Sequence, residues 1–273
     1  MYKDRNWKYL RFTNSFMFAS VLLSNKDITK EIIELFNPEL DIKEIEFIDE
    51  EKEIKLVRSN KYIRLDVLVK LNDGTLVNVE MQAYDKDNLR KRLRYYSSNI
   101  DIYLLRKQTE YNDLPNKIMM MICTFDIFGE NKAIYEFKMR TNDNPPIELN
   151  DGVKFVILNS KGDFSSLSAP QKAFLDYVNS DFTSTSLTSK IKEKVDSLNY
   201  DGIWRATYMR LELDLYDMKQ EGIKEGLKIG VHKIVYNAYK KAINNNKSTE
   251  QAIKEIADVI DMPLDEIKRI LDE

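Results

Sequence analysis

Two carboxylates and an amide interrupt the most apolar part of a predicted hairpin. Residues 64–82 read RLDVLVKLNDGTLVNVEMQ, in which Asp66, Glu80 and Gln82 stand among valines and leucines. The Asn-Asp-Gly run at 72–74 predicts a three-residue turn with its glycine in the left-handed conformation. Counting back from this turn places Asp66 opposite Glu80, and strand alternation places Gln82 on the same face. The opposite face is then covered by Val67, Val69, Val77, Val79 and Met81.

Adjoining carboxylates repel each other and lose hydration on burial unless a positive charge lies between them. A divalent cation would satisfy both acids, and oxygen ligands favour hard ions such as Mg²⁺ or Mn²⁺. The alternative is that both acids meet water or an arginine at a sheet edge. Arg64, or an arginine of the following helix, could serve as that partner.

Composition excludes several other classes of site. The single histidine, His232, lies in a charged helical stretch, so a Ser-His-Asp triad and a His/Cys zinc cluster are both excluded. The single cysteine, Cys123, lies in an apolar run and is expected to be a reduced core thiol. This cysteine usage predicts a cytoplasmic location, and the charged N-terminal sequence has no apolar signal segment. The most apolar stretch, residues 118–128, is too short for a membrane span.

Basic side chains gather immediately after the hairpin, although the whole chain carries a net charge of −3. Residues 86–107 hold seven basic and two acidic side chains, a local net charge of +5. Such a run is a candidate surface for the phosphates of nucleic acid. From charge alone, the alternative of a solvated helix face is favoured over a phosphate-binding surface.

The pattern of apolar residues predicts an α/β fold with a mixed sheet. Residues 41–57 are expected to form a strand or hairpin, with Ile45 and Phe47 on one arm and Ile54 and Leu56 on the other. Helices are predicted at 13–36 and 86–106, and further strands at 117–125, 133–140 and 153–158.

The sequence changes character near residues 160–170, where serine, glycine and proline cluster, and is mostly helical beyond them. Gly222, Gly226 and Gly230 share one helix face, which favours close packing of a second helix, within the chain or in a homodimer; a weakly helical, flexible segment is the alternative. Residues 248–273 have helix-turn-helix spacing but a net charge of −5, so a structural or interaction module is favoured over a DNA reader.

Several stretches together resemble the recombination-promoting nuclease and putative transposase family of the PD-(D/E)XK nuclease superfamily. These stretches are TNSFMFASVL, the hairpin itself, RLRYYSSNID and YNDLPNKIMMMICTFDIFG, within residues 10–160. The resemblance implies a restriction-endonuclease-like domain at 1–165, followed by a helical extension at 166–246 and the terminal module at 247–273. It also implies a Mg²⁺- or Mn²⁺-dependent endonuclease that acts on DNA in recombination, transposition or defence.

The resemblance also assigns roles within the hairpin and the helix after it. Asp66 and Glu80 look like the metal ligands, together with the carbonyl of Met81. Gln82 stands at the family's lysine position, where its amide can orient water but carries no positive charge. The basic side chains expected to contact the DNA backbone are Arg90, Arg92 and Arg94.

One position departs from the family pattern. Related sequences tend to have an aspartate in the first helix where this chain has Ser15. If that acid helps to hold metal-bound water, the protein would be a weakened nuclease, or a nuclease fold that acts by binding DNA or protein. Glu31 or Glu34 could supply the missing carboxylate from the following turns.

Overall fold

The computed structural model describes residues 7–48, 66–105 and 110–272. The chain divides into two compact units, Met1–Arg205 and Ala206–Glu273. Each unit has a hydrophobic core of its own.

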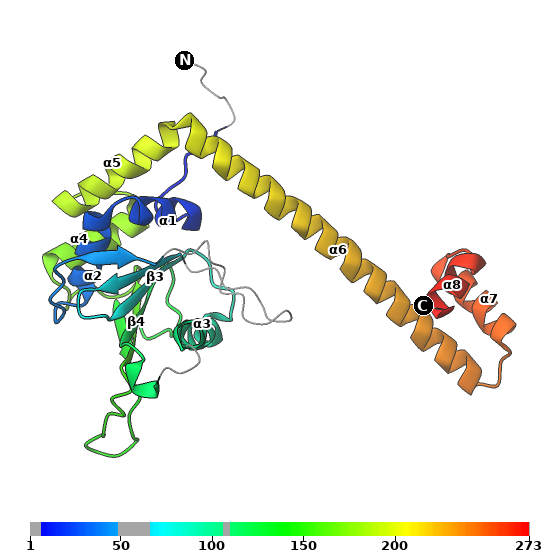
Figure 1. Ribbon diagram of the computed structural model, residues 1–273. Helices are drawn as coiled ribbons and strands as arrows, with labels where there is room; N and C mark the ends of the chain where they lie inside the picture. The colour runs from blue at the N-terminus through cyan, green and yellow to red at the C-terminus, as the bar shows by residue number, and fades with distance from the viewer. Residues whose placement is uncertain (1–6, 49–65, 106–109, 273) are drawn as a thin grey trace. The chain divides into compact units, whose positions relative to one another are not determined.

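A six-stranded mixed sheet forms the centre of the first unit, in the order β1-β2-β3-β4-β6-β5 (Figure 1). The three central strands, β3, β4 and β6, are parallel, and the other pairings are antiparallel. This confirms the predicted α/β, restriction-endonuclease-like class. The strands are β1 (Ile45–Phe47), β2 (Val67–Leu71), β3 (Leu76–Gln82), β4 (Lys117–Cys123), β5 (Ile134–Phe137) and β6 (Val153–Asn159).

Helices cover both faces of this sheet, which explains why every residue of β3 and β4 is buried. Helix α3 (Leu89–Leu104) packs its Leu89, Leu93 and Ile100 on one face, against even-numbered side chains of β2 and β3. The opposite face of β2 and β3 contacts α1 (Ser15–Leu23), which packs on α2 (Lys26–Phe36). Glu80 and Gln82 therefore point to the α3 side, as strand alternation requires.

The predicted domain boundary at residue 165 does not coincide with the division of the structure. Helices α4 (Ala169–Ser180) and α5 (Ser186–Tyr200) belong to the first unit because they pack on α1 and α2. The ring of Phe174 in α4 lies 6.4 Å from that of Phe12 and 5.5 Å from that of Phe36. The cluster of serine, glycine and proline marks a loop within one core.

The second unit consists of most of α6 (Gly202–Asn244), with α7 (Thr249–Ile260) and α8 (Leu264–Asp272). Its small core is Val235, Ile253, Ile256 and Ile267. Ser248 and Gln251 form the predicted capping box at the start of α7. Helix α6 runs unbroken through Gly222, Gly226 and Gly230, so this segment is helical.

Other predicted elements are found with small shifts. The predicted helix at 13–36 is two helices, because it breaks at Ser24 and Asn25, where the Asn25 side chain donates to the carbonyl of Val21 at 2.7 Å. The predicted arm with Ile54 and Leu56 lies outside the described residues. Across the described ranges, no helix is both long and apolar enough to cross a membrane.

The buried side chain of Asn199 ties α5 to the segment before α1. Its Oδ1 accepts from the main-chain N–H of Leu10 at 2.9 Å, and its Nδ2 donates to the Leu10 carbonyl at 2.9 Å. Oδ1 also accepts from Trp7 Nε1 at 3.2 Å. Because this contact spans about 190 residues of sequence, it positions the N-terminal segment on the core.

We therefore expect Asn199→Ala to destabilise the first unit by about 2–4 kcal/mol, since it leaves buried main-chain groups of Leu10 without partners. The midpoint of urea denaturation, followed by tryptophan fluorescence, should fall accordingly. Ser197→Ala, an exposed change on the same helix, is the matched control. Equal midpoints for the two variants would show that Asn199 does not hold this segment.

Candidate functional site

The β2–β3 hairpin has the predicted register. The Leu71 N–H donates to the Thr75 carbonyl at 2.8 Å, and Gly74 closes the turn with a positive φ of 89°. Val67 pairs with Val79, so the next residues outward, Asp66 and Glu80, face each other across the two strands. The register predicted from the turn sequence, with Asp66 opposite Glu80, therefore agrees with the structure.

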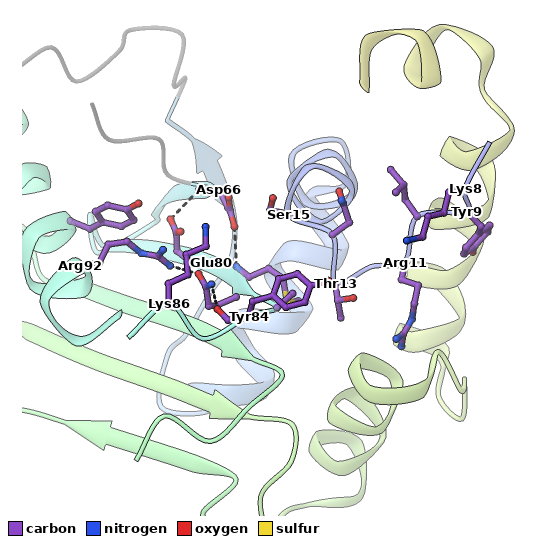
Figure 2. A pocket seen from close by; sticks show the side chains of 16 residues that line it. Lys8, Tyr9, Arg11, Thr13, Ser15, Asp66, Glu80, Tyr84, Lys86 and Arg92 are labelled. Carbon is purple, nitrogen blue, oxygen red and sulfur yellow. Dashed lines mark hydrogen bonds between the residues drawn. The ribbon is translucent and has the colours of Figure 1, made fainter. Parts of the chain in front are cut away.

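Asp66 and Glu80 are joined through main-chain hydrogen bonds (Figure 2). The Asp66 N–H donates to Glu80 Oε1 at 3.0 Å, and the Met81 N–H donates to Asp66 Oδ2 at 3.0 Å. Asn78 Nδ2 also donates to Glu80 Oε1, at 3.1 Å. Three donors thus hold two carboxylates side by side, although the carboxylates repel each other.

This placement perturbs the acidity of Glu80. Its side chain is only 4% exposed, and burial, followed by repulsion from Asp66, raises the pKa of Glu80 from 4.5 to about 8. The Asn78 and Asp66 hydrogen bonds and the charge of Arg92 oppose the increase. Without a bound metal ion, Glu80 therefore holds a proton at neutral pH.

Gln82 is held by the first turn of α3. Its Oε1 accepts a hydrogen bond from Arg92 Nη2, and its Nε2 donates to the Tyr84 carbonyl. The Arg92 guanidinium also lies over the Tyr96 ring, 5.7 Å from the centroid. A positive charge therefore reaches the place where the family's lysine would stand, although Gln82 itself is neutral.

Only one of the three predicted DNA-contacting arginines lies at this site. Arg92 lines a pocket beside Asp66 and Glu80, whereas Arg90 and Arg94 do not. Arg90 donates to the Ile127 carbonyl at 2.7 Å and lies over the Phe128 ring, while Arg94 is exposed on α3. The reason is helical geometry, since residues two apart in a helix point in nearly opposite directions.

A pocket of about 460 Å³ opens beside the two carboxylates. It is lined by α1, by the end of β3, by the start of α3 and by the segment before α1, as Figure 2 shows. Sequence reasoning missed that last segment because its approach depends on the long-range contact with Asn199. The basic side chains in the lining are Lys8, Arg11, Lys86 and Arg92.

Ser15 also lines the pocket, so the departure from the family pattern falls at the site. It is the first residue of α1, directly after the N-cap Asn14. The suggested substitutes do not reach the site: Glu31 pairs with Lys190 at 3.2 Å and Glu34 with Lys30 at 3.6 Å. Neither glutamate lines the pocket.

The donor set suits a hard divalent cation. Mg²⁺ is usually bound through one or two carboxylates and keeps several waters, which Asp66 and Glu80 could satisfy. The Gln82 carbonyl accepts from Thr124 of the β4 side, so alternation turns the Met81 carbonyl toward the Asp66 side. Within the described ranges, no cluster of three or more His, Cys, Asp or Glu side chains could hold a metal, so an ion would depend on these two carboxylates, the Met81 carbonyl and water.

Of the partners suggested as alternatives to a metal, Arg64 lies outside the described residues. Arg92 is close enough to lower the pKa of Glu80, but its Nη2 donates a hydrogen bond to Gln82. The glutamate remains a buried acid with a raised pKa, which indicates that Arg92 does not fully compensate the pair.

We expect Glu80→Gln to be more stable than the natural protein at alkaline pH when metal is chelated. Because folding raises the Glu80 pKa, the natural protein loses stability as pH rises from about 4.5 to about 8. The loss is at most roughly 1.4 kcal/mol per pH unit. Melting temperatures measured with EDTA should therefore diverge across this window and coincide near pH 4.

Glu46→Gln, which changes an exposed glutamate of β1, is the control and should show no such divergence. A constant difference between Glu80→Gln and the natural protein from pH 4 to pH 8 would contradict a buried acid with a raised pKa.

Comparison with known proteins agrees with this geometry. The family described as "PD-(D/E)XK nuclease family transposase" matches residues 14–164, which include the hairpin, α3 and the strands through β6. Searches of curated proteins and of solved structures gave no match. The family match extends over more than half of the chain, and this protein therefore belongs to the PD-(D/E)XK nuclease family transposases.

Proposed function

We propose that this protein is a metal-dependent DNA endonuclease that hydrolyses phosphodiester bonds, with Mg²⁺ or Mn²⁺ as its cofactor. The observation that carries the proposal is the pair of half-buried Asp66 and buried Glu80, which lines a pocket with basic side chains. A pair of this kind is costly to fold and becomes favourable when a cation neutralises it. The family match supports the reaction class.

Asp66, Glu80 and the Met81 carbonyl would hold the ion. When bound, a divalent cation lowers the pKa of water and stabilises negative charge on a phosphate. The pKa of Glu80 also means that the carboxylate must give up its proton before it can act as a ligand.

Gln82 and Arg92 would act together beside the ion. The Gln82 amide has both a donor and an acceptor, so it can orient a water molecule, and Arg92 fixes that amide through Oε1. Arg92 also supplies the positive charge that a lysine would contribute, directed at the phosphate. We propose this role for Arg92 in place of a simple contact with the DNA backbone.

Lys8, Lys86 and Arg11 would contact phosphates on either side of the reacting one. They line the pocket from two distant parts of the sequence, and DNA affinity arises mainly from such neutralised phosphates. Arg11 is anchored by Asp181 at 2.6 Å, which limits its reach.

Ser15 favours a second candidate function, DNA binding without cleavage. With serine at the position of the family's acid, the ion would have one carboxylate fewer in its surroundings, and the protein could bind DNA without cutting it. The two functions differ in a single measurable property, the turnover of DNA in the presence of bound metal.

We expect Asp66→Asn and Glu80→Gln each to lower plasmid nicking with Mg²⁺ or Mn²⁺ by about a hundredfold or more, because each removes charge that holds the ion. Glu46→Gln is the control and should keep full activity. Calorimetric titration of the same proteins with Mn²⁺ should show binding by the natural chain and not by the site variants.

Cleavage that persists equally in the site variants would reject the nuclease proposal. Mn²⁺ or DNA binding without any cleavage by the natural protein would favour the second function.

We expect Arg92→Gln to lower the cleavage rate by on the order of a hundredfold, since one charged donor to the phosphate is lost. Arg92→Lys should retain part of the rate because the charge remains. DNA affinity measured with Ca²⁺, which does not support turnover in this proposal, should change by less than the rate.

Arg94→Gln, on the exposed part of the same helix, is the matched control. It should lower the cleavage rate only to the extent that it lowers DNA affinity. If Arg92→Gln reduces affinity as much as it reduces rate, Arg92 is only a DNA contact.

A further inference from the structure

Helix α6 exposes a regular row of apolar side chains between residues 209 and 234. Counted in heptads, the a and d positions are apolar or glycine with one exception, Gln220. The exposed fractions of the large apolar residues at these positions run from 47% for Ile223 to 66% for Leu227. The large members of the row are Met209, Leu213, Tyr216, Ile223, Leu227 and Ile234.

The small core of the second unit does not use this row. Helices α7 and α8 pack against another face of α6, through Val231, Val235 and Ala238. At Gly230, which belongs to the row, an added Cβ would meet no atom within 4 Å. The row covers about 39 Å of helix, long enough for a stable two-helix contact.

A second exposed row lies on the opposite side of α6 but is less suited to pairing. It contains Leu215, Met218, Ile229 and Tyr236, and it is interrupted by the ionisable Glu225 and His232. Charged residues within an apolar seam disfavour burial.

Flanking charges indicate what covers the first row. In a parallel pair of identical helices, each g residue meets the e residue five positions later in the other copy. That arrangement brings together Arg205 with Arg210, Glu212 with Asp217, and Lys219 with Lys224. Every charged pair is repulsive, so a parallel dimer is disfavoured.

In an antiparallel pair of α6 helices, one register brings opposite charges together. With the two-fold axis between Glu221 and Gly222, Asp217 meets Lys224 of the second copy, and symmetry repeats this pair. Glu212 meets Lys233 in the same way, and none of the facing charges is repulsive. Shifting the register by one heptad in either direction brings lysines against lysines.

The same register also matches the sizes of the apolar side chains. Tyr216 lies across from Leu227, and Leu213 lies across from Gly230, so large residues face smaller ones along the seam. Gln220 then faces Ile223 at the centre, where a polar residue can specify register.

We propose that two copies of this chain associate through antiparallel pairing of their α6 helices, with Asp217 facing Lys224 of the other copy. The surface is distinct from the candidate nuclease site, because all of its residues lie in the second unit.

The test is charge reversal with rescue in the full-length protein, followed by sedimentation equilibrium. Asp217→Lys and Lys224→Asp should each weaken dimerisation by on the order of tenfold, because two attractive pairs become repulsive. The double variant should restore the affinity of the natural chain. Asp214→Lys is the matched control, because it makes the same charge change at an exposed position that neither belongs to the row nor flanks it.

A monomeric natural protein at all concentrations would overturn the proposal, as would a dimer unaffected by both reversals. Single reversals that strengthen the dimer would show parallel pairing and would also overturn it. Circular dichroism of each variant checks that α6 remains helical.

Discussion

The repulsion between Asp66 and Glu80 is the constraint on which the candidate site depends. Two carboxylates are brought together by the hairpin and held by main-chain N–H groups of the same two strands. The surrounding sheet and α3 exclude water from Glu80, which raises its pKa. A folded chain would gain stability by losing this glutamate, so its presence is best explained by a ligand that needs it.

The rest of the first unit serves to position groups around that pair. Helix α3 brings Arg92 to Gln82, and α1 brings Ser15 to the pocket. Helix α5 contributes to the pocket indirectly, since its Asn199 fixes the segment that carries Lys8 and Arg11. The site is thus assembled from both ends of a unit of about 200 residues, which explains why α4 and α5 cannot be separated from the sheet.

Local sequence signals predicted the hairpin well, because a turn and a two-residue period determine register without help from the rest of the chain. Asp66 and Glu80 were found in this way. The partner of Gln82 could not be found, since α3 carries several arginines and only its packing angle on the sheet selects Arg92. The contribution of residues 8–11 was also invisible, because it depends on contacts with residues far along the chain.

Cys123 is a free cysteine in the core, as predicted, and burial raises the pKa of its thiol to about 12. The compact units divide after residue 205 and not at the predicted residue 165, because loop composition does not reveal which helices share a core.

The most direct measurement is the anomalous diffraction of a crystal of the protein soaked in Mn²⁺. We expect a strong peak about 2.2 Å from oxygen atoms of both Asp66 and Glu80. A saturating soak that leaves this position without a peak, while the two side chains stay as described, would contradict it.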